Sequence, residues 1–109
     1  MTDEIREPTF LVLAALADRR RHGYGIIQEV DRLSAGGTRL KAGTLYAMLD
    51  RLSSDGLIMS AGEEVVEGRL RRYYELSSEG SALLAAESRR RMVVSKEALR
   101  RLRIAGSLA

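Results

Sequence analysis

The chain has 109 residues, 45% of them hydrophobic and 30% charged, which fits one soluble domain with a single hydrophobic core. Because it has no cysteine and one histidine, thiolate zinc sites, disulfide scaffolds, catalytic thiols and two-histidine metal sites within one chain are excluded. The longest apolar run, residues 10–17, is far shorter than the ~20 residues that cross a bilayer, and the first residues do not resemble a signal peptide, so we expect a cytoplasmic protein without membrane contact or cofactor.

The net charge of +3 is unevenly distributed along the chain. From Ser81 to the end there are seven basic and two acidic residues, whereas residues 1–80 contain eleven basic and thirteen acidic residues. The basic character therefore resides in the C-terminal segment. Any nucleic-acid contact made by residues 1–80 depends on where individual arginines lie.

Three helices are predicted in the first half of the chain. Pro8 suits the first turn of a helix, and residues 10–17 are apolar nearly all round, which indicates a central, buried helix. After a charged break, a second helix ends at Gly36-Gly37, and its apolar stripe is Ile26, Ile27, Val30 and Leu33. Residues 38–41 are expected to be extended. A third helix stops before Gly56, and its apolar stripe is Leu45, Met48, Leu49 and Leu52.

Beyond Gly56 the apolar period changes from that of a helix to that of a strand. Residues 57–66 and 69–77 predict two strands, with Gly62 and Gly68 at the flexible positions of the hairpin between them. One face of the second strand is expected to carry Leu70, Tyr74 and Leu76, and the other face Arg69, Arg71 and Tyr73. Residues 78–102 predict one helix of roughly 35 Å, because no glycine or proline follows Gly80 there.

The order of helix, helix, helix, hairpin and long helix predicts a mostly helical α+β fold, a winged helix-turn-helix with a long C-terminal dimerisation helix. We expect a DNA-binding domain in residues 1–80 and the dimerisation helix in residues 81–109. In such a fold one surface helix enters the major groove, which is roughly 12 Å wide, while an arginine-rich hairpin contacts neighbouring phosphates or the minor groove. Many small α+β domains share this order without binding DNA, so the local chemistry decides.

The outer side of the third helix, near its start, is expected to carry Gly43, Thr44 and Ala47. Small residues there permit close approach, Thr44 can bond a phosphate or contact a thymine methyl, and free N–H groups of the first turn favour an anion. We expect Tyr46 to be half-buried with its hydroxyl outward, in contact with a phosphate. The remaining DNA-binding candidates of this region are Arg39, Lys41 and Arg51. The alternative is an exposed amphipathic helix in which Gly43 serves packing.

Arginines of the predicted hairpin form the second candidate cluster. Arg69 and Arg71 point the same way on a strand and are placed to straddle a line of phosphates or a narrow minor groove. Arg72 has the opposite parity, so we assign it to structure or to a phosphate at the base of the hairpin. A cross-strand ladder of salt bridges is the alternative, because the first strand and the turn carry Glu63, Glu64 and Glu67.

Three linked segments, which span about residues 8–80, resemble the PadR family of transcriptional regulators. They are His22-Gly23-Tyr24 with Ile26; Gly43-Thr44-Leu45-Tyr46 with Leu49, Arg51, Leu52, Gly56, Leu57 and Ile58; and Gly68-Arg69, Arg71-Arg72-Tyr73-Tyr74, Leu76 and Gly80. The resemblance implies a homodimeric winged-helix repressor whose long C-terminal helix contributes the dimer contacts and often the effector site. Lys41-Ala42 stands where the family usually has Ser-Pro, so the usual helix cap is absent. Leu70 stands at a position that is commonly proline.

The C-terminal helix is predicted to form the dimer interface by packing on residues 10–16 of a second chain, because its apolar side would otherwise stay exposed. The interface candidates are Phe10, Leu13, Leu84, Met92, Leu99 and Leu102. The run Arg89-Arg90-Arg91 interrupts any heptad pattern, which argues against a simple coiled coil. We interpret this run as a solvated face in preference to a site for an anionic effector.

Two remaining aromatic features are given structural interpretations. His22 is expected to complete the turn into the second helix rather than to bind a metal or catalyse a reaction. Tyr73 and Tyr74 alternate on a strand, so one ring is expected to pack inward and the other to lie outward.

Together these features predict a sequence-specific regulator of transcription that binds double-stranded DNA, a homodimeric repressor on a pseudo-palindromic operator that responds to a small-molecule effector. The alternative is a winged-helix protein-interaction module without direct DNA binding, which the acidic balance of residues 1–80 keeps open. An enzyme is not expected, because no nucleophile and base pair stands out and no GxxxxGK[ST] phosphate loop is present.

Overall fold

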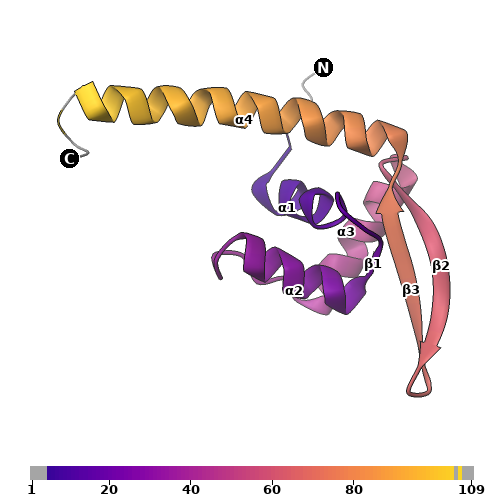
Figure 1. Ribbon diagram of the computed structural model, residues 1–109. Helices are drawn as coiled ribbons and strands as arrows, with labels where there is room; N and C mark the ends of the chain where they lie inside the picture. Colours follow the sequence, from indigo (N-terminus) through magenta and orange to yellow (C-terminus); the bar gives the residue numbers. More distant parts are fainter. Residues whose placement is uncertain (1–4, 105, 107–109) are drawn as a thin grey trace.

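The computed structural model describes residues 5–104 and 106 and has the predicted order of elements, with one short strand added between the first two helices (Figure 1). The helices are α1 (Glu7–Ala15), α2 (Gly23–Leu33), α3 (Ala42–Ser54) and α4 (Ser78–Ile104), and the strands are β1 (Arg21–His22), β2 (Ile58–Val66) and β3 (Arg69–Leu76). The mostly helical α+β prediction is therefore confirmed, and α4 is the long C-terminal helix.

The core is built around α1, which lies between α4 and α2 (Figure 1). Leu11, Val12 and Leu13 are consecutive in the sequence yet all at most 6% exposed, because neighbours cover α1 on more than one side. The other buried hydrophobic residues are Ala15, Leu16, Ile26, Val30, Leu45, Met48, Leu49, Leu52 and Ile58. The four-residue stripe predicted for α3 is thus entirely buried, which fixes the opposite side of α3 as surface.

The three strands form an antiparallel sheet in the order β1-β3-β2. Strand β1 has two residues and pairs with β3 through Arg21↔Tyr74 and His22↔Tyr73, whereas the sequence predicted only a charged break there. We call the β2–β3 hairpin the wing. Glu67 and Gly68 form its two-residue turn with φ angles of 52° and 76°, the backbone that a tight hairpin of this kind requires.

The end of α2 differs from its prediction. The helix ends at Leu33 rather than at Gly36-Gly37, because Ser34 turns the chain: its Oγ lies 2.8 Å from the Val30 carbonyl oxygen and accepts a bond from the Thr38 N–H at 3.0 Å. Residues 38–41 then approach α3 without forming a strand.

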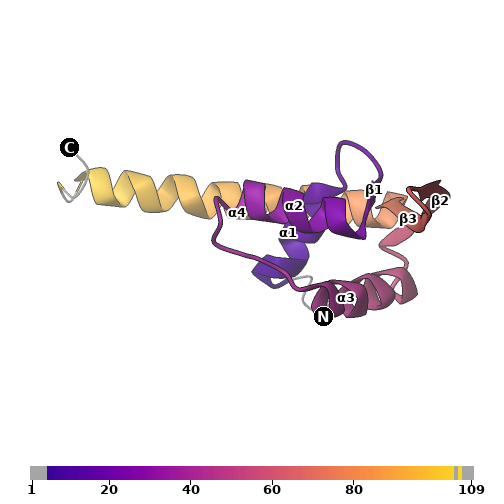
Figure 2. The ribbon, with the colours of Figure 1, turned by 90° about the horizontal axis from the view of Figure 1, so that it is seen from below.

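Helix α4 begins at the sheet and runs past the other elements (Figures 1 and 2). Ser77 caps it, since the Ser77 Oγ accepts a bond from the Gly80 N–H at 3.0 Å. The protruding end gives a radius of gyration of 16.3 Å. A compact domain of about 100 residues has one of about 13 Å. Within residues 5–104 and 106, no helix is long and apolar enough to cross a membrane.

Candidate nucleic-acid interface

The start of α3 presents small side chains and an uncapped helix end to solvent. Gly43, Thr44 and Ala47 are all exposed, as predicted, because the buried stripe occupies the opposite side of the helix. Lys41 holds the N-cap position in an extended conformation, and its side chain makes no capping bond. The first-turn N–H groups therefore have no side-chain acceptor at this cap, and a helix end of this kind attracts anions such as phosphate.

Tyr46 packs on the start of α2 while half of its surface stays exposed. Its hydroxyl lies over Gly23, where an added Cβ would be 2.5 Å from the hydroxyl oxygen. Gly23 is itself buried, so the close packing of α2 and α3 depends on a residue without a side chain at this position. The hydroxyl thus lies against Gly23, whereas an outward hydroxyl was predicted from the sequence.

The wing arginines divide into a paired and an unpaired group. The Arg72 Nε lies 3.4 Å from Glu63 Oε2, so the salt-bridge explanation holds for Arg72. In the part of the chain that the structure describes, neither Arg69 nor Arg71 forms an ion pair. Arg69 and Arg71 are therefore the cations of the wing that remain available to an outside anion.

The face of β3 that carries Leu70, Tyr74 and Leu76 is covered by the core along only part of its length. Tyr74 and Leu76 pack against the core as expected, but Leu70 is 55% exposed. The wing extends beyond the core at that point, so strand parity no longer determines burial. Tyr73 lies on the other face, which confirms that one tyrosine is inward and one outward.

A hollow between the wing and the helices brings several predicted residues together. It is lined by His22, Gly23, Tyr24, Tyr46 and the β3 residues 69–72. Burial, followed by the neighbouring Arg71 guanidinium, lowers the pKa of His22, so the imidazole is largely neutral at pH 7 and the positive charge here comes from arginine. His22 stands at the N-cap of α2, consistent with the structural interpretation. Among the described residues no group of three or more His, Asp or Glu could hold a metal.

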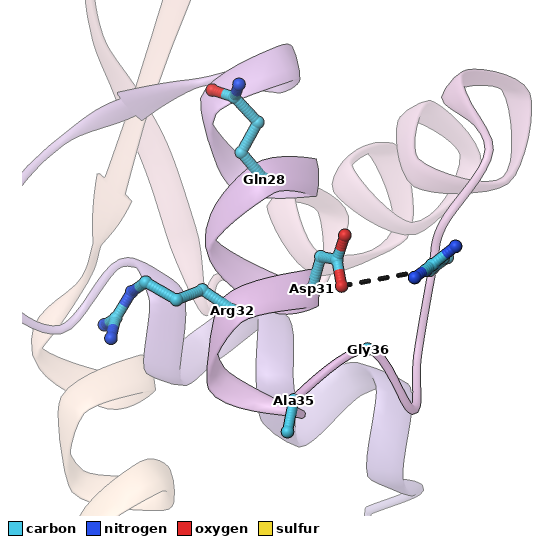
Figure 3. Close-up of a pocket in the computed structure, with 6 residues that line it drawn as sticks. Gln28, Asp31, Arg32, Ala35 and Gly36 are labelled. Atoms are coloured by element: carbon cyan, nitrogen blue, oxygen red, sulfur yellow. Dashed lines mark ion pairs between the residues drawn. The ribbon is translucent and has the colours of Figure 1, made fainter.

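Arg39 and Arg51 lie away from this hollow. Figure 3 shows the surface at the end of α2, where the Arg39 Nε lies 3.8 Å from Asp31 Oδ1, next to Gln28 and Gly36. Arg51 borders a different hollow, beside the start of α1. The structure therefore groups Tyr46 with the wing arginines and places Arg39 and Arg51 elsewhere.

The predicted dimer residues have three different environments. Leu13 is fully buried in the chain's own core, so it offers no surface to a second copy in this structure. Phe10 and Leu84 are partly buried, and the Arg91 guanidinium lies 4.0 Å from the centre of the Phe10 ring. Exposed apolar surface remains on the outer part of α4, where Met92, Leu99 and Leu102 are 53%, 50% and 43% exposed.

In the arginine run at the centre of α4, Arg89 and Arg90 are exposed, as their interpretation as a solvated face predicts, whereas Arg91 is not. The Arg91 side chain is 27% exposed and donates hydrogen bonds to Glu87, Glu7 and the Ile5 carbonyl oxygen. It therefore joins α4 to the start of α1.

The first helix offers little apolar surface to a second copy. Residues 11–13, 15 and 16 are buried within the chain, so the predicted packing of α4 on residues 10–16 of a second copy has little apolar surface available.

Two residues near the interface, Tyr24 and Arg20, were not predicted as site residues. Tyr24 is 63% exposed and lines the hollow, and Arg20 reaches across the sheet to the wing. The His22-Gly23-Tyr24 motif contained a signal for Tyr24, since it places an aromatic residue directly after the buried glycine. Arg20 had no local signal, because its partner Ala61 is 41 residues away in the sequence and its partner Tyr73 is farther still.

Comparison with known proteins gives consistent matches. A family model described as "Transcriptional regulator PadR-like family" matches residues 12–86. Transcriptional regulator Rv3488 of Mycobacterium tuberculosis is 40% identical over 88 residues, which cover 81% of this chain and 78% of that protein.

Solved structures give the same fold. A PadR family transcription regulator from Clostridium difficile R20291 has a TM-score of 0.70 at 28% identity, covering 86% of this chain and 96% of its own. Bacillus subtilis PadR, solved in complex with operator DNA, has a TM-score of 0.65 at 20% identity and covers 74% of this chain and 46% of its own.

Proposed function

We propose that this chain, which belongs to the PadR-like family of transcriptional regulators, binds double-stranded DNA sequence-specifically as a homodimeric repressor. The family is one of regulators and not of enzymes. In this proposal residues 1–80 bind the DNA, and residues 81–109 form the dimerisation segment, whose final residues 105 and 107–109 lie outside the described part of the chain.

The observation that carries the DNA-binding proposal is the exposed start of α3 beside the wing. Small side chains and an uncapped helix end at Gly43, Thr44 and Ala47 suit entry into a major groove. Tyr46 links this helix to the hollow bordered by Arg69 and Arg71, which form no ion pair with any other described residue. A groove contact by α3 and phosphate contacts by the wing are therefore compatible within one bound protein.

The first test selects fragments of the host genome with purified protein at physiological salt and then measures affinity against competitor DNA. We expect enrichment of one pseudo-palindromic site. In the variant Thr44→Tyr the added ring would block the groove, so we expect loss of binding, whereas Ser53→Tyr at the exposed end of α3 retains it. Absent or salt-insensitive duplex binding would instead support the protein-interaction module, and unaltered affinity of Thr44→Tyr would mean that another helix enters the groove.

A second test separates the wing arginines. Arg71→Ala is expected to weaken binding to all sequences and to lower the slope of log K against log salt by about one, as one phosphate contact is lost. Arg72→Ala is the matched control, because Arg72 already has Glu63 as its partner. An equal effect of the two variants would contradict the assignment of phosphate contact to Arg71.

The homodimer is proposed to form through the outer part of α4. Six large hydrophobic residues are exposed there, namely Met92, Val93, Val94, Leu99, Leu102 and Ile104. Exposed apolar surface of this kind is typical of an interface between copies of one chain. Sedimentation equilibrium at micromolar concentration should show a dimer, which Leu99→Glu dissociates and Lys96→Glu leaves intact. A monomeric wild-type chain would overturn this part of the proposal.

Repression and its release by a small-molecule effector are the remaining parts of the proposal, and they rest on what the resemblance of the three sequence segments implies. Transcription in vitro from a promoter that carries the selected site tests repression directly. Lower transcript yield with the wild-type chain, and not with Thr44→Tyr, is the expected result. Higher yield would identify an activator.

A further inference from the structure

The wing contains a β-bulge at the level of β1. The register passes from Ser60↔Tyr74 to Glu63↔Arg72, so Ala61 and Gly62 together face Tyr73 on β3. A bulge disrupts the ladder of hydrogen bonds and bends the strand. It also leaves the Ala61 carbonyl oxygen free to accept a bond from outside the ladder.

Arg20 makes that bond from the opposite edge of the sheet, where it directly precedes β1. Its Nη1 donates to the Ala61 carbonyl oxygen at 2.7 Å, and its guanidinium lies 4.2 Å from the centre of the Tyr73 ring. Because β3 is the central strand, the Arg20 side chain spans the sheet from the β1 side to β2. The Tyr73 hydroxyl in turn donates to Glu64 at 2.9 Å, which continues the contact toward the tip of the wing.

Gly62 fits this contact in two ways. Its φ of +105° is a conformation that residues with side chains rarely adopt, and an added Cβ would lie 3.0 Å from Arg20 Nη1. The glycine thus permits both the bulge and the close approach of the guanidinium.

The other end of the contact is anchored in the body of the domain. Arg21, the next residue, donates from Nε to the Ala15 carbonyl oxygen at 2.7 Å and lies 3.8 Å from Glu29 on α2. Its side chain is only 16% exposed. The segment that carries Arg20 is therefore fixed to α1 and α2, while Arg20 itself holds the wing.

We propose that Arg20 is a positioning residue for DNA binding, which fixes the angle of the wing relative to α2 and α3 by bonding Ala61 and stacking on Tyr73. This inference rests on the proposed DNA-binding function. A two-stranded hairpin is at best marginally stable by itself, and much of the wing lies beyond the core. The phosphate contacts of Arg69 and Arg71 then depend on a contact made at the base of the wing.

Hydrogen exchange of the free protein tests the contact without DNA. Arg20→Met removes the guanidinium and keeps an apolar stem, and we expect amides of residues 61–73 to exchange roughly tenfold faster, as for loss of one hydrogen bond and one cation–π contact. Arg19→Met is the matched control, because the Arg19 side chain is 70% exposed and lies 3.6 Å from Asp18 rather than near the wing. Unchanged exchange in Arg20→Met would overturn the proposal.

Duplex affinity then separates positioning from direct contact. If Arg20 acts through the wing, Arg20→Met and Arg71→Ala weaken binding less together than the sum of their separate effects, because both remove the same wing contact. If Arg20 touches a phosphate itself, the two effects add, and the positioning role is overturned. Failure of the wild-type chain to bind any duplex would overturn the proposed function, while the exchange measurement would still report on the contact itself.

Discussion

The two halves of α4 contain the same local arrangement of charges in different surroundings. Glu87 is bonded by the arginines three and four positions later, Arg90 and Arg91, and Glu97 is bonded in the same way by its own two arginines. The Glu87 side chain is 4% exposed, whereas that of Glu97 is 40% exposed. Both glutamates lie on one continuous helix with the same local charge pattern. The difference in their exposure therefore comes from the tertiary contacts of the inner half.

The inner half packs on the chain's own domain. Gly80 approaches the backbone of Leu57, and Arg91 reaches the start of α1 and stacks on Phe10. The outer half, from Met92 onward, exposes its apolar side chains. A helix segment of about a dozen residues is marginal in water without packing, so the outer half depends on its continuity with the inner half and on the proposed partner chain.

The largest expected effect on the contrast between the two halves comes from Gly80→Ala, which should displace the inner half of α4 from the domain. The added Cβ would lie 2.0 Å from the Leu57 carbonyl oxygen, and because that atom belongs to the backbone the helix itself must shift. We expect the free energy of unfolding to fall by about 3 kcal/mol, measured by urea denaturation. Gly43→Ala is the control for stability, since a Cβ there has nothing within 4 Å. Equal stability of the two variants would show that α4 docks without this close approach.

A second variant pair isolates the two charge clusters. Arg91→Met removes a stack on Phe10 and a bond to the Ile5 carbonyl oxygen, and we expect it to cost about 1–2 kcal/mol of stability. Exchange of the amides at the start of α1 should also accelerate. The counterpart Arg101→Met should leave the exchange of α1 unchanged, because Arg101 bonds Glu97 on its own helix. Acceleration by both variants would mean that the outer half also supports α1.

The same distinction explains what the sequence could and could not predict. Helix α3, the wing and α4 were predictable because apolar period, turn glycines and the absence of breakers are local properties. The burial of the predicted α3 stripe also followed from its period. The burial of Glu87 did not, because the Glu-x-x-Arg-Arg pattern is the same in both halves and α1 decides which half is covered.

Functional residues were likewise predictable where their position follows from local sequence, and not where it depends on tertiary contacts. The exposure of Gly43 and Thr44 could be predicted from helix geometry alone. Strand β1 and Arg20 could not, since a two-residue strand has no detectable period and the partners of Arg20 lie on the wing. Leu70 shares a face of β3 with Tyr74 and Leu76, as predicted, but its exposure could not be predicted, because strand parity gives the direction of a side chain and not the extent of the core.

The smallest expected effect is the pH dependence of the two glutamates. Hydrogen bonding from Arg90, and then Arg91, lowers the pKa of Glu87, and hydrogen bonds from Arg100 and Arg101 lower the pKa of Glu97. A carboxyl whose pKa is lower in the folded state stabilises the fold above its unfolded pKa, about 4.3, and this contribution is lost as pH falls through the folded pKa. Both Glu87→Gln and Glu97→Gln should therefore flatten the loss of stability below about pH 4.3.

Salt distinguishes the two halves in this measurement. The Glu97 cluster is exposed to solvent, so ~1 M salt, with a Debye length of about 3 Å, should abolish the effect of Glu97→Gln on urea midpoints between pH 7 and pH 3. The Glu87 side chain is covered while its arginine partners are partly exposed, and a partly buried pair is screened much less than an exposed one, so the effect of Glu87→Gln should persist. Equal salt sensitivity would show that Glu87 is as accessible to ions as Glu97, and that the docking of the inner half leaves the electrostatics of its cluster unchanged.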